Sequence, residues 1–361
     1  MLGSLTEFHL PSYPEELRLL DPVLAEGDFA GRSHWVGEYE AALARHFGVA
    51  RAIATSSGSA ALHTALHVLA TERRGGTVIV PATAPVPTVL PVLATGLEPV
   101  FVDVQLDSFA FDVTDLERKL DERCVAAITV PMYGYPHDYG PMQELLVARG
   151  VPFVEDAAHA HGTRVDGRLA GTLGTAGCFS THQRKLLVTG EGGFLLIDVS
   201  LADRAKDFTA LGVGGHEPVA VNHKLSGIQA VLGTHRLGRL EERIQARRRN
   251  AKRILDGLAG TAFVELGLPP RSRCNHYALA LRLDAGADKL ARVRSAHTQA
   301  GVPCENQRFG GRPIYESGPF RRFAQCCPNA ERLLESLFVM PCHEGLTEPQ
   351  LDVIVRSLRG D

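Results

Sequence analysis

The chain lacks several features that would assign it to a class of protein. Among its 361 residues there are only six lysines and one tryptophan, and the formal net charge is −3. So small a charge leaves no broad basic surface of the kind that binds nucleic acid or anionic membranes. We therefore expect no nucleic-acid partner and no membrane partner.

The cysteines also give no sign of a disulfide framework. There are seven, an odd number, none is spaced C-x-x-C, and only Cys326 and Cys327 are neighbours. In a chain of this length the pattern favours reduced thiols and a cytoplasmic protein. The N-terminus lacks a basic segment followed by an apolar core, so no signal peptide is expected.

One charge-free stretch, Val78 to Leu97, is long enough to cross a bilayer. It contains four prolines, at positions 81, 85, 87 and 91. Each proline removes a hydrogen bond that a spanning helix needs. The stretch is interpreted as a buried strand, Thr77–Val80, followed by a turn and a proline-kinked helix.

Short apolar runs alternate with helical patterns between residues 50 and 200. Because most runs are continuously apolar, they indicate a largely parallel sheet covered on both faces, an α/β fold. Two of the intervening helices are predicted at Ser59–Thr71 and Gly140–Arg149. The strand candidates are Ala52–Ala54, Thr77–Val80, Pro99–Val104, Val125–Val130, Val151–Glu155 and Phe194–Ile197.

A long helical pattern from Leu225 to Ile254 follows this region. It includes the run Arg247-Arg248-Arg249, which is interpreted as a solvated helix face. We predict a large domain over residues 1–240 and a smaller C-terminal α+β domain over residues 241–361. The elements expected in the smaller domain are a strand at Tyr277–Leu283, a helix at Ala287–Ala300, an irregular loop at Cys304–Phe320 and two short C-terminal helices.

The most informative segment runs from Phe179 to Gly193, where Lys185 precedes the turn Gly190-Glu191-Gly192-Gly193. In a chain rich in arginine, this lysine suggests chemistry that a guanidinium cannot do. A desolvated amine can lose its proton and attack a carbonyl. Lysines of this kind hold pyridoxal 5′-phosphate (PLP) as a Schiff base.

Two further motifs fit the same cofactor. Ser57-Gly58-Ser59 lies between a predicted strand and a helix, where free N–H groups can bind a phosphate, although ordinary turns have similar sequences. Asp156 ends a predicted strand and could keep a pyridine nitrogen protonated, or could simply cap a helix. His159 could contact the cofactor ring or be a core histidine.

Together these motifs resemble the DegT/StrS family of PLP-dependent sugar aminotransferases. The resemblance covers nearly the whole chain and includes Ser57–Leu62, Glu155–Ala158, Phe179-Ser180 with Lys185, Asn222–Ser226 and Cys327–Glu331. It implies the PLP-dependent transferase fold type I, as in aspartate aminotransferase, with a large domain on a mostly parallel sheet.

The resemblance also implies roles for individual residues. Lys185 would be catalytic and covalently bound to PLP, and Asp156 would pair with the pyridine nitrogen. The other cofactor-binding residues would be Gly58, Ser59, His159, Ser180 and Asn222. Asn222 would reach the phosphate from a neighbouring subunit, which implies a homodimer with shared active sites.

Three positions depart from the family pattern. Pro85 stands where the family usually has an aromatic residue that stacks on the cofactor. Lys224 replaces an arginine, and the loop Gln307–Tyr315 lacks a tyrosine ahead of its proline. These departures indicate weaker cofactor stacking and a different substrate pocket.

The expected activity is amino transfer from glutamate or glutamine to a nucleotide-linked keto-sugar or a keto-cyclitol, with pyridoxamine 5′-phosphate formed in the half-reaction. Such an activity would serve aminosugar, antibiotic or surface-glycan biosynthesis. Two alternatives stay open on the sequence: other PLP chemistry such as dehydration of a sugar, and a non-catalytic relative.

Overall fold

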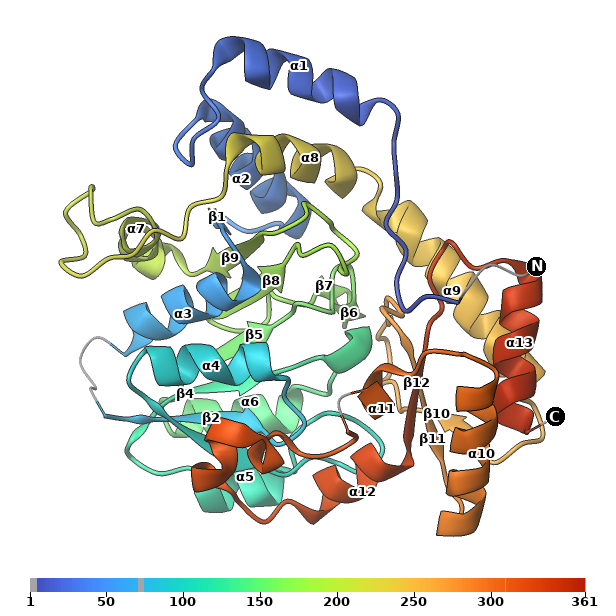
Figure 1. The fold of residues 1–361 in the computed structure, drawn as a ribbon. Helices are drawn as coiled ribbons and strands as arrows, with labels where there is room; N and C mark the ends of the chain where they lie inside the picture. Colours follow the sequence, from blue (N-terminus) through green and yellow to red (C-terminus); the bar gives the residue numbers. More distant parts are fainter. Residues whose placement is uncertain (1–4, 71–74, 309, 361) are drawn as a thin grey trace.

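The computed structural model describes residues 5–70, 75–308 and 310–360. Within these residues the chain forms a seven-stranded sheet and a three-stranded sheet. Each sheet is packed against its own helices, the large one on the left and the small one on the right of Figure 1. A small ribbon pairs β6 (Arg164–Val165) with β7 (Arg168–Leu169).

The large sheet confirms the predicted α/β pattern. Its strands β2, β3, β4, β5 and β8 pair in parallel, and β9 runs antiparallel to both β8 and β1. All six strand candidates are present, and β8 is an additional strand, rich in small residues of low strand propensity. In spatial order the strands are β1 (Ala52–Thr55), β9 (Gly193–Ile197), β8 (Ala176–Ser180), β5 (Phe153–Asp156), β4 (Cys124–Thr129), β2 (Thr77–Pro81) and β3 (Glu98–Val102).

Helices cover both faces of this sheet, which explains the continuous apolar runs. Val78 and Val80 face a core shared with α2 (His34–Phe47), α3 (Gly58–Leu69) and α4 (Val86–Ala94). Ile79, between those valines, faces a second core formed with α5 (Val113–Lys119) and α6 (Gly140–Ala148). Alternate residues of one strand are therefore buried on opposite faces.

The long helical pattern is two helices, α8 (Gly227–Leu237) and α9 (Leu240–Gly257). Helix α9 leads to the antiparallel small sheet of β10 (Phe263–Glu265), β11 (Leu279–Leu283) and β12 (Leu337–Met340). The two predicted C-terminal helices are α12 (Pro328–Ser336) and α13 (Glu348–Arg359), with β12 between them. Helices α10 (Ala287–Gln299) and α13 bury apolar residues in the core of the small sheet.

The segment expected to be irregular contains short helical turns and crosses back to the large sheet. These turns are α11 (Glu305–Arg308), η2 (Ile314–Glu316) and η3 (Gly318–Phe323). Ile314, Phe320 and Leu333 belong to the core of the large sheet. The chain beyond residue 240 thus contributes to both cores, and the boundary at 240/241 stays a prediction.

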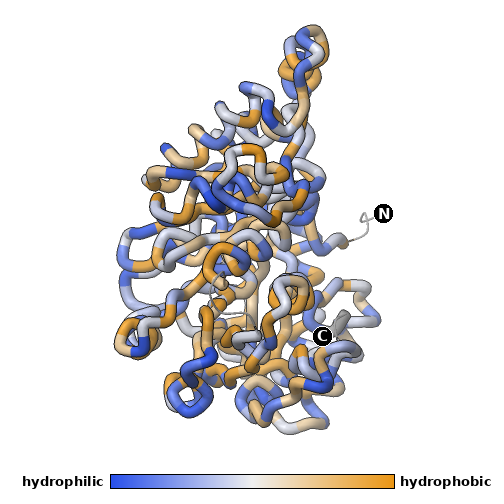
Figure 2. The backbone as a smooth tube through the Cα atoms, turned by 90° about the vertical axis from the view of Figure 1, so that its left-hand side faces the viewer, coloured by the Kyte–Doolittle hydropathy of each residue, from blue (hydrophilic) through white to orange (hydrophobic). Residues whose placement is uncertain are grey.

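The remaining elements are α1 (Glu16–Glu26), η1 (Met132–Gly134) and α7 (Val199–Thr209). Along the outer helices, hydrophobic and hydrophilic residues alternate in Figure 2, as expected where a helix buries one side. Within the described ranges, none of the helices has the length and apolar character needed to cross a bilayer. The proline-kinked helix predicted in the charge-free stretch is α4, with Pro91 inside it.

The interpretation of the arginine run was wrong for its first member. Arg247 is only 2% exposed, whereas Arg249 is exposed. The Nη1 of Arg247 donates to the Tyr277 carbonyl at 2.7 Å, and its Nε lies 3.1 Å from a Glu344 carboxylate oxygen. The buried charge is therefore matched by an opposite charge and a carbonyl from the small-sheet side.

Candidate active site

The carboxyl ends of β1, β8, β5, β4 and β2 lie along one edge of the large sheet, because these strands run in the same direction. The loops beyond this edge surround a cavity of about 660 Å³. In open α/β sheets, ligands bind at this edge. Of the predicted site residues, all but Asn222 line the cavity: Gly58, Ser59, Asp156, His159, Ser180 and Lys185.

At one end of the cavity, the start of α3 forms an anion cradle. Ser57 caps the helix, and its Oγ accepts a hydrogen bond from the Ala60 N–H at 3.0 Å. A Cβ added at Gly58 would lie 2.8 Å from the Cβ of Ser180, so only glycine fits here. The first-turn N–H groups and the helix dipole favour a bound anion such as a phosphate.

Asp156 ends β5 and is buried at the cavity wall. Its Oδ2 accepts a hydrogen bond from the Thr88 hydroxyl at 2.5 Å, and its Oδ1 accepts one from the Ala158 N–H at 3.2 Å. Burial raises the pKa of this carboxyl, while the two hydrogen bonds and the nearby Lys185 act to lower it. No helix begins after Asp156, so it is not a helix cap.

Lys185 lies in the loop between β8 and β9, and its backbone N–H donates to the His182 carbonyl at 2.8 Å. His182 itself lies beyond the end of β8. Burial of the Lys185 amine lowers its pKa to about 8, against the opposing charges of Glu305 and Asp156. Near neutral pH an appreciable fraction of the amine is therefore uncharged and nucleophilic.

The His159 ring packs against two tyrosine rings. Its ring is stacked on Tyr277, with centroids 4.1 Å apart and planes at 7°, and the Tyr133 ring is 5.8 Å away. Its Nδ1 accepts a hydrogen bond from the Tyr133 N–H at 3.3 Å, which assigns the ring proton to Nε2. Burial, and then the charge of Lys185, holds the pKa of His159 well below its usual value.

The C-terminal part of the chain supplies the opposite wall with Tyr277, Glu305, Asn306 and Arg312. Sequence reasoning missed these residues, and it also missed Thr88. Thr88 lies in an uncharged helix and Tyr277 at the start of a predicted strand, so neither carried a local signal. Arg312 lies in the loop Gln307–Tyr315, which was already expected to differ in the substrate pocket, and Glu305 lies two residues before that loop.

Asn222 is not brought to this cavity within one chain. It is exposed, and its Oδ1 accepts a hydrogen bond from the Lys224 amine at 2.6 Å. Pro85 lines the cavity as the residue preceding α4, with no aromatic ring at that position. Of the divergent loop Gln307–Tyr315, Phe309 lies outside the described residues.

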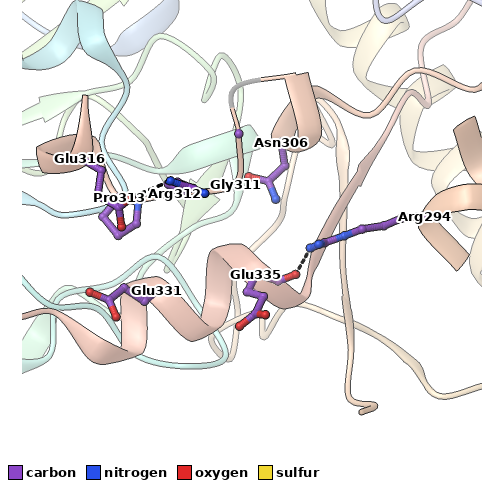
Figure 3. Close-up of a pocket in the computed structure, with 9 residues that line it drawn as sticks. Arg294, Asn306, Gly311, Arg312, Pro313, Glu316, Glu331 and Glu335 are labelled. Carbon is purple, nitrogen blue, oxygen red and sulfur yellow. Dashed lines mark hydrogen bonds and ion pairs between the residues drawn. The ribbon is translucent and has the colours of Figure 1, made fainter. Parts of the chain in front are cut away.

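A second cavity of about 560 Å³ adjoins the first and shares Asn306, Gly311 and Arg312 with it. Figure 3 shows the two arginines of this second cavity, Arg294 and Arg312, with their hydrogen-bond partners. Arg312 donates to the Glu316 carboxylate at 3.4 Å, and Arg294 donates to the Glu335 carbonyl. Among the described residues that line this cavity there is no lysine or cysteine, whereas the candidate nucleophile Lys185 lines the first cavity.

Comparison with known proteins agrees with this geometry. Residues 13–359 match the model of the DegT/DnrJ/EryC1/StrS aminotransferase family. The chain is 35% identical over 349 residues to a dTDP-3-amino-3,4,6-trideoxy-alpha-D-glucose transaminase from Micromonospora megalomicea subsp. nigra, covering 90% of this chain and 88% of that one. It is 33% identical to an L-glutamine:2-deoxy-scyllo-inosose aminotransferase from Streptomyces fradiae, covering 93% and 84%.

A solved structure shows the same architecture. The crystal structure of DesV from S. venezuelae, in complex with a ketimine intermediate, superposes with a TM-score of 0.88 at 28% identity. The match covers 99% of this chain and 98% of that chain. The fold type expected from the sequence is therefore confirmed.

Proposed function

Because the chain belongs to the DegT/DnrJ/EryC1/StrS aminotransferase family, we propose that the 660 Å³ cavity binds both PLP and the substrates of amino transfer. The protein is a PLP-dependent aminotransferase of the kind that makes aminosugars and aminocyclitols. The observation that carries the assignment of the site is one cavity with a phosphate cradle, a buried carboxylate and a lysine whose pKa is lowered.

The residues present fit the cofactor. The cradle needs glycine at position 58, because any larger residue would collide with Ser180. Ser59 and Ser180 add hydroxyl groups at the same end of the cavity. In this proposal these three residues bind the phosphate, and the helix dipole of α3 favours its negative charge.

Asp156 would hold the pyridine nitrogen in its protonated form. A carboxylate in a buried position stabilises a nearby cation strongly, because little water screens the pair. Thr88 would keep the carboxylate oriented toward the ring through its hydrogen bond of 2.5 Å. His159, packed against two tyrosine rings, would present its Nε2–H to the cofactor.

When bound, PLP supplies an electron sink that makes the α-proton of an amino acid acidic enough to remove. Lys185 would hold the cofactor covalently and, once displaced by the amino donor, act as the base that moves this proton. Its pKa of about 8 suits that role, because a general base works best when its pKa lies near the working pH.

The substrates follow from the named relatives. One relative is named for a dTDP-linked aminosugar and another for glutamine and a keto-cyclitol. We propose glutamate or glutamine as amino donor, and a nucleotide-linked keto-sugar or keto-cyclitol as acceptor. The presence of Lys185 argues against the dehydratase alternative, since the resembling dehydratases have a histidine at this position.

We propose a homodimer in which Asn222 completes the phosphate site of the neighbouring subunit. Asn222 is exposed and lies outside the cavity of its own chain. Several large apolar side chains are also exposed, which is typical of a surface that is covered in an assembly. They include Val86 and Leu90 on α4 and Leu211, Val213 and Val219 in the loop before Asn222. The seven free thiols suit a cytoplasmic enzyme.

The test is product formation with defined substrates. The full-length enzyme is loaded with PLP and incubated with glutamate or glutamine and a panel of keto-sugar nucleotides and keto-cyclitols. Mass spectrometry should detect the aminated acceptor together with one keto acid per amino group transferred. A dehydrated sugar without keto acid would refute amino transfer at this site. Sedimentation analysis of the wild type and of Val213→Asp tests the dimer.

A further inference from the structure

Tyr277 contacts two of the reactive side chains described above, although it comes from the small-sheet side of the molecule. The Lys185 Nζ lies 5.2 Å from the centroid of the Tyr277 ring, over its face. The same ring is stacked on His159. A ring face at this distance attracts an ammonium group through its quadrupole.

Asn275 connects Tyr277 to the loop that carries His159. This asparagine is fully buried, and its Nδ2 donates to the carbonyls of His159 at 2.8 Å and His161 at 2.9 Å. Its Oδ1 accepts a hydrogen bond from the Tyr277 N–H at 2.8 Å. The side chain of Asn275 therefore connects the backbone of Tyr277 to the backbone of His159.

Arg247 binds the carbonyl side of the Tyr277 backbone, opposite the N–H that Asn275 binds. Its Nη1 donates to the Tyr277 carbonyl at 2.7 Å, and Glu344 balances its charge. Glu344 also pairs with Arg243, whose guanidinium donates to the carbonyl of Leu186, the residue after Lys185. One ion-paired cluster thus fixes the backbone at Tyr277 and next to Lys185.

The local backbone shows that this placement has a conformational cost. His276, between Asn275 and Tyr277, has a φ of 50°, in the left-handed region that non-glycine residues seldom adopt. Gly134 has a φ of 87°, and an added Cβ there would lie 1.8 Å from the Oδ1 of Asn275. Such strained positions persist where surrounding contacts enforce them, and they are frequent at functional sites.

The electrostatic role of the ring follows from its surroundings. Burial, followed by the charge of Glu305, raises the pKa of the Tyr277 hydroxyl far above its usual value, so the side chain stays neutral. Burial disfavours the ammonium form of Lys185. A neutral π-face offsets part of that penalty without introducing a second anion beside Asp156.

We propose that Tyr277 is a positioning residue for the reacting amine: its ring face stabilises protonated Lys185 and keeps the His159 ring parallel to its own. This inference rests on the proposed role of Lys185. It adds a function for a residue outside the large-sheet motifs, since the amine must carry a proton transiently when it acts as a base.

The test varies the ring charge distribution at nearly constant shape. In the full-length chain, Tyr277 is replaced by phenylalanine, by phenylalanines carrying increasing numbers of ring fluorines, and by leucine. Before PLP is added, the pKa of Lys185 is measured from the pH dependence of trace acetylation by acetic anhydride, followed by peptide mass spectrometry. Y277F is the matched control, because it removes only the hydroxyl.

Y277F should leave the Lys185 pKa unchanged. Fluorination should lower the pKa stepwise, and pentafluorophenylalanine or leucine should lower it by about 0.5–1 unit. Equal pKa values across the fluorinated series would overturn the proposal, because a purely structural ring would tolerate fluorine. The fluorinated variants keep the ring, so this result does not depend on the folding of Y277L.

The proposed function is tested separately in the same samples. Borohydride treatment of the PLP-loaded wild type should fix the cofactor to Lys185, as shown by peptide mass spectrometry. Failure of this step refutes the role of Lys185 itself. Success of this step with an unchanged pKa series refutes only the role of Tyr277.

Discussion

The two walls of the cavity are built in different ways. On the large-sheet wall, Asp156 and Ser180 each end a strand, and Lys185 follows five residues after β8 ends at Ser180. On the small-sheet wall, Tyr277 and Glu305 come from a bend before β11 and from the short helix α11. The first wall is organised by local chain order, and the second depends on contacts between distant segments.

This difference between the two walls predicts which part of the site tolerates amino-acid substitution. In the proposed function, the large-sheet wall carries the groups that handle protons and charge. The small-sheet wall would orient these groups and shape the space for the acceptor. We therefore expect changes in the first wall to abolish chemistry and changes in the second to alter stability, pKa or substrate choice.

The largest effect is expected from Lys185→Ala. Removing the amine removes both the covalent attachment and the base, so turnover should fall by at least about 10³-fold. The absorbance band of the lysine-bound cofactor should be absent. Lys252→Ala on the exposed face of α9 serves as control and should retain wild-type turnover. Activity retained in the Lys185 variant would place the chemistry on another residue.

Asp156→Asn should have the next largest effect. The substitution preserves the size of the side chain but removes its charge, and the loss of a buried charge pair costs about 3 kcal/mol, or roughly a hundredfold in turnover. Steady-state kinetics with the amino donor measures this. Asp203→Asn, which breaks only a surface pair with Arg51, should differ little from the wild type. A similar loss in both variants would contradict the special role of Asp156.

Arg247→Met tests the connection between the two walls. The substitution leaves the carbonyl of Tyr277 without its hydrogen-bond donor and removes one of the positive charges paired with the Glu344 carboxylate. The free energy of unfolding should therefore fall by about 3 kcal/mol. Denaturant unfolding monitored by circular dichroism measures the change. Arg249→Met, two residues along the same helix but exposed, should change stability by less than about 0.5 kcal/mol. Equal effects would mean that burial of Arg247 is unimportant.

The pH dependence of cofactor attachment should show the lowered pKa of Lys185. The neutral amine is the reactive form, and with a pKa of about 8 its fraction rises about tenfold between pH 7 and 9. An unperturbed lysine would continue to gain reactivity above pH 10. Stopped-flow absorbance after mixing the cofactor-free protein with PLP should therefore reach a plateau above pH 9. A rate that still rises steeply there would contradict the shift.

The smallest effect is expected at Pro85. Restoring an aromatic ring with Pro85→Trp should add stacking worth about 0.5–1.5 kcal/mol, tightening PLP binding by up to roughly tenfold. Equilibrium dialysis measures the dissociation constant. Pro85→Ala controls for the loss of the proline before α4. If the alanine variant tightens binding equally, relief of the proline constraint and not stacking is responsible.

Most of the large-sheet region could be predicted because its signals are local. The strands could be recognised from their apolar runs, and Asp156, Ser59 and Lys185 from their positions beside glycines and strand ends. The features that the sequence analysis did not predict also have local explanations. Strand β8 is built from small residues, and Arg247 sits in a run of arginines that differ only in which side of α9 they occupy.

The sequence by itself determined the α/β architecture, the candidate cofactor motifs and the lysine proposed to do the chemistry, because hydrophobic periodicity and strand–loop order act over a few residues. Only the tertiary structure decided that Tyr277 lines the cavity, that Thr88 donates to Asp156 and that Arg247 donates to Tyr277. Thr88 is 68 residues from Asp156, and Arg247 is 30 residues from Tyr277. Such contacts depend on packing between separate elements, which no local pattern encodes.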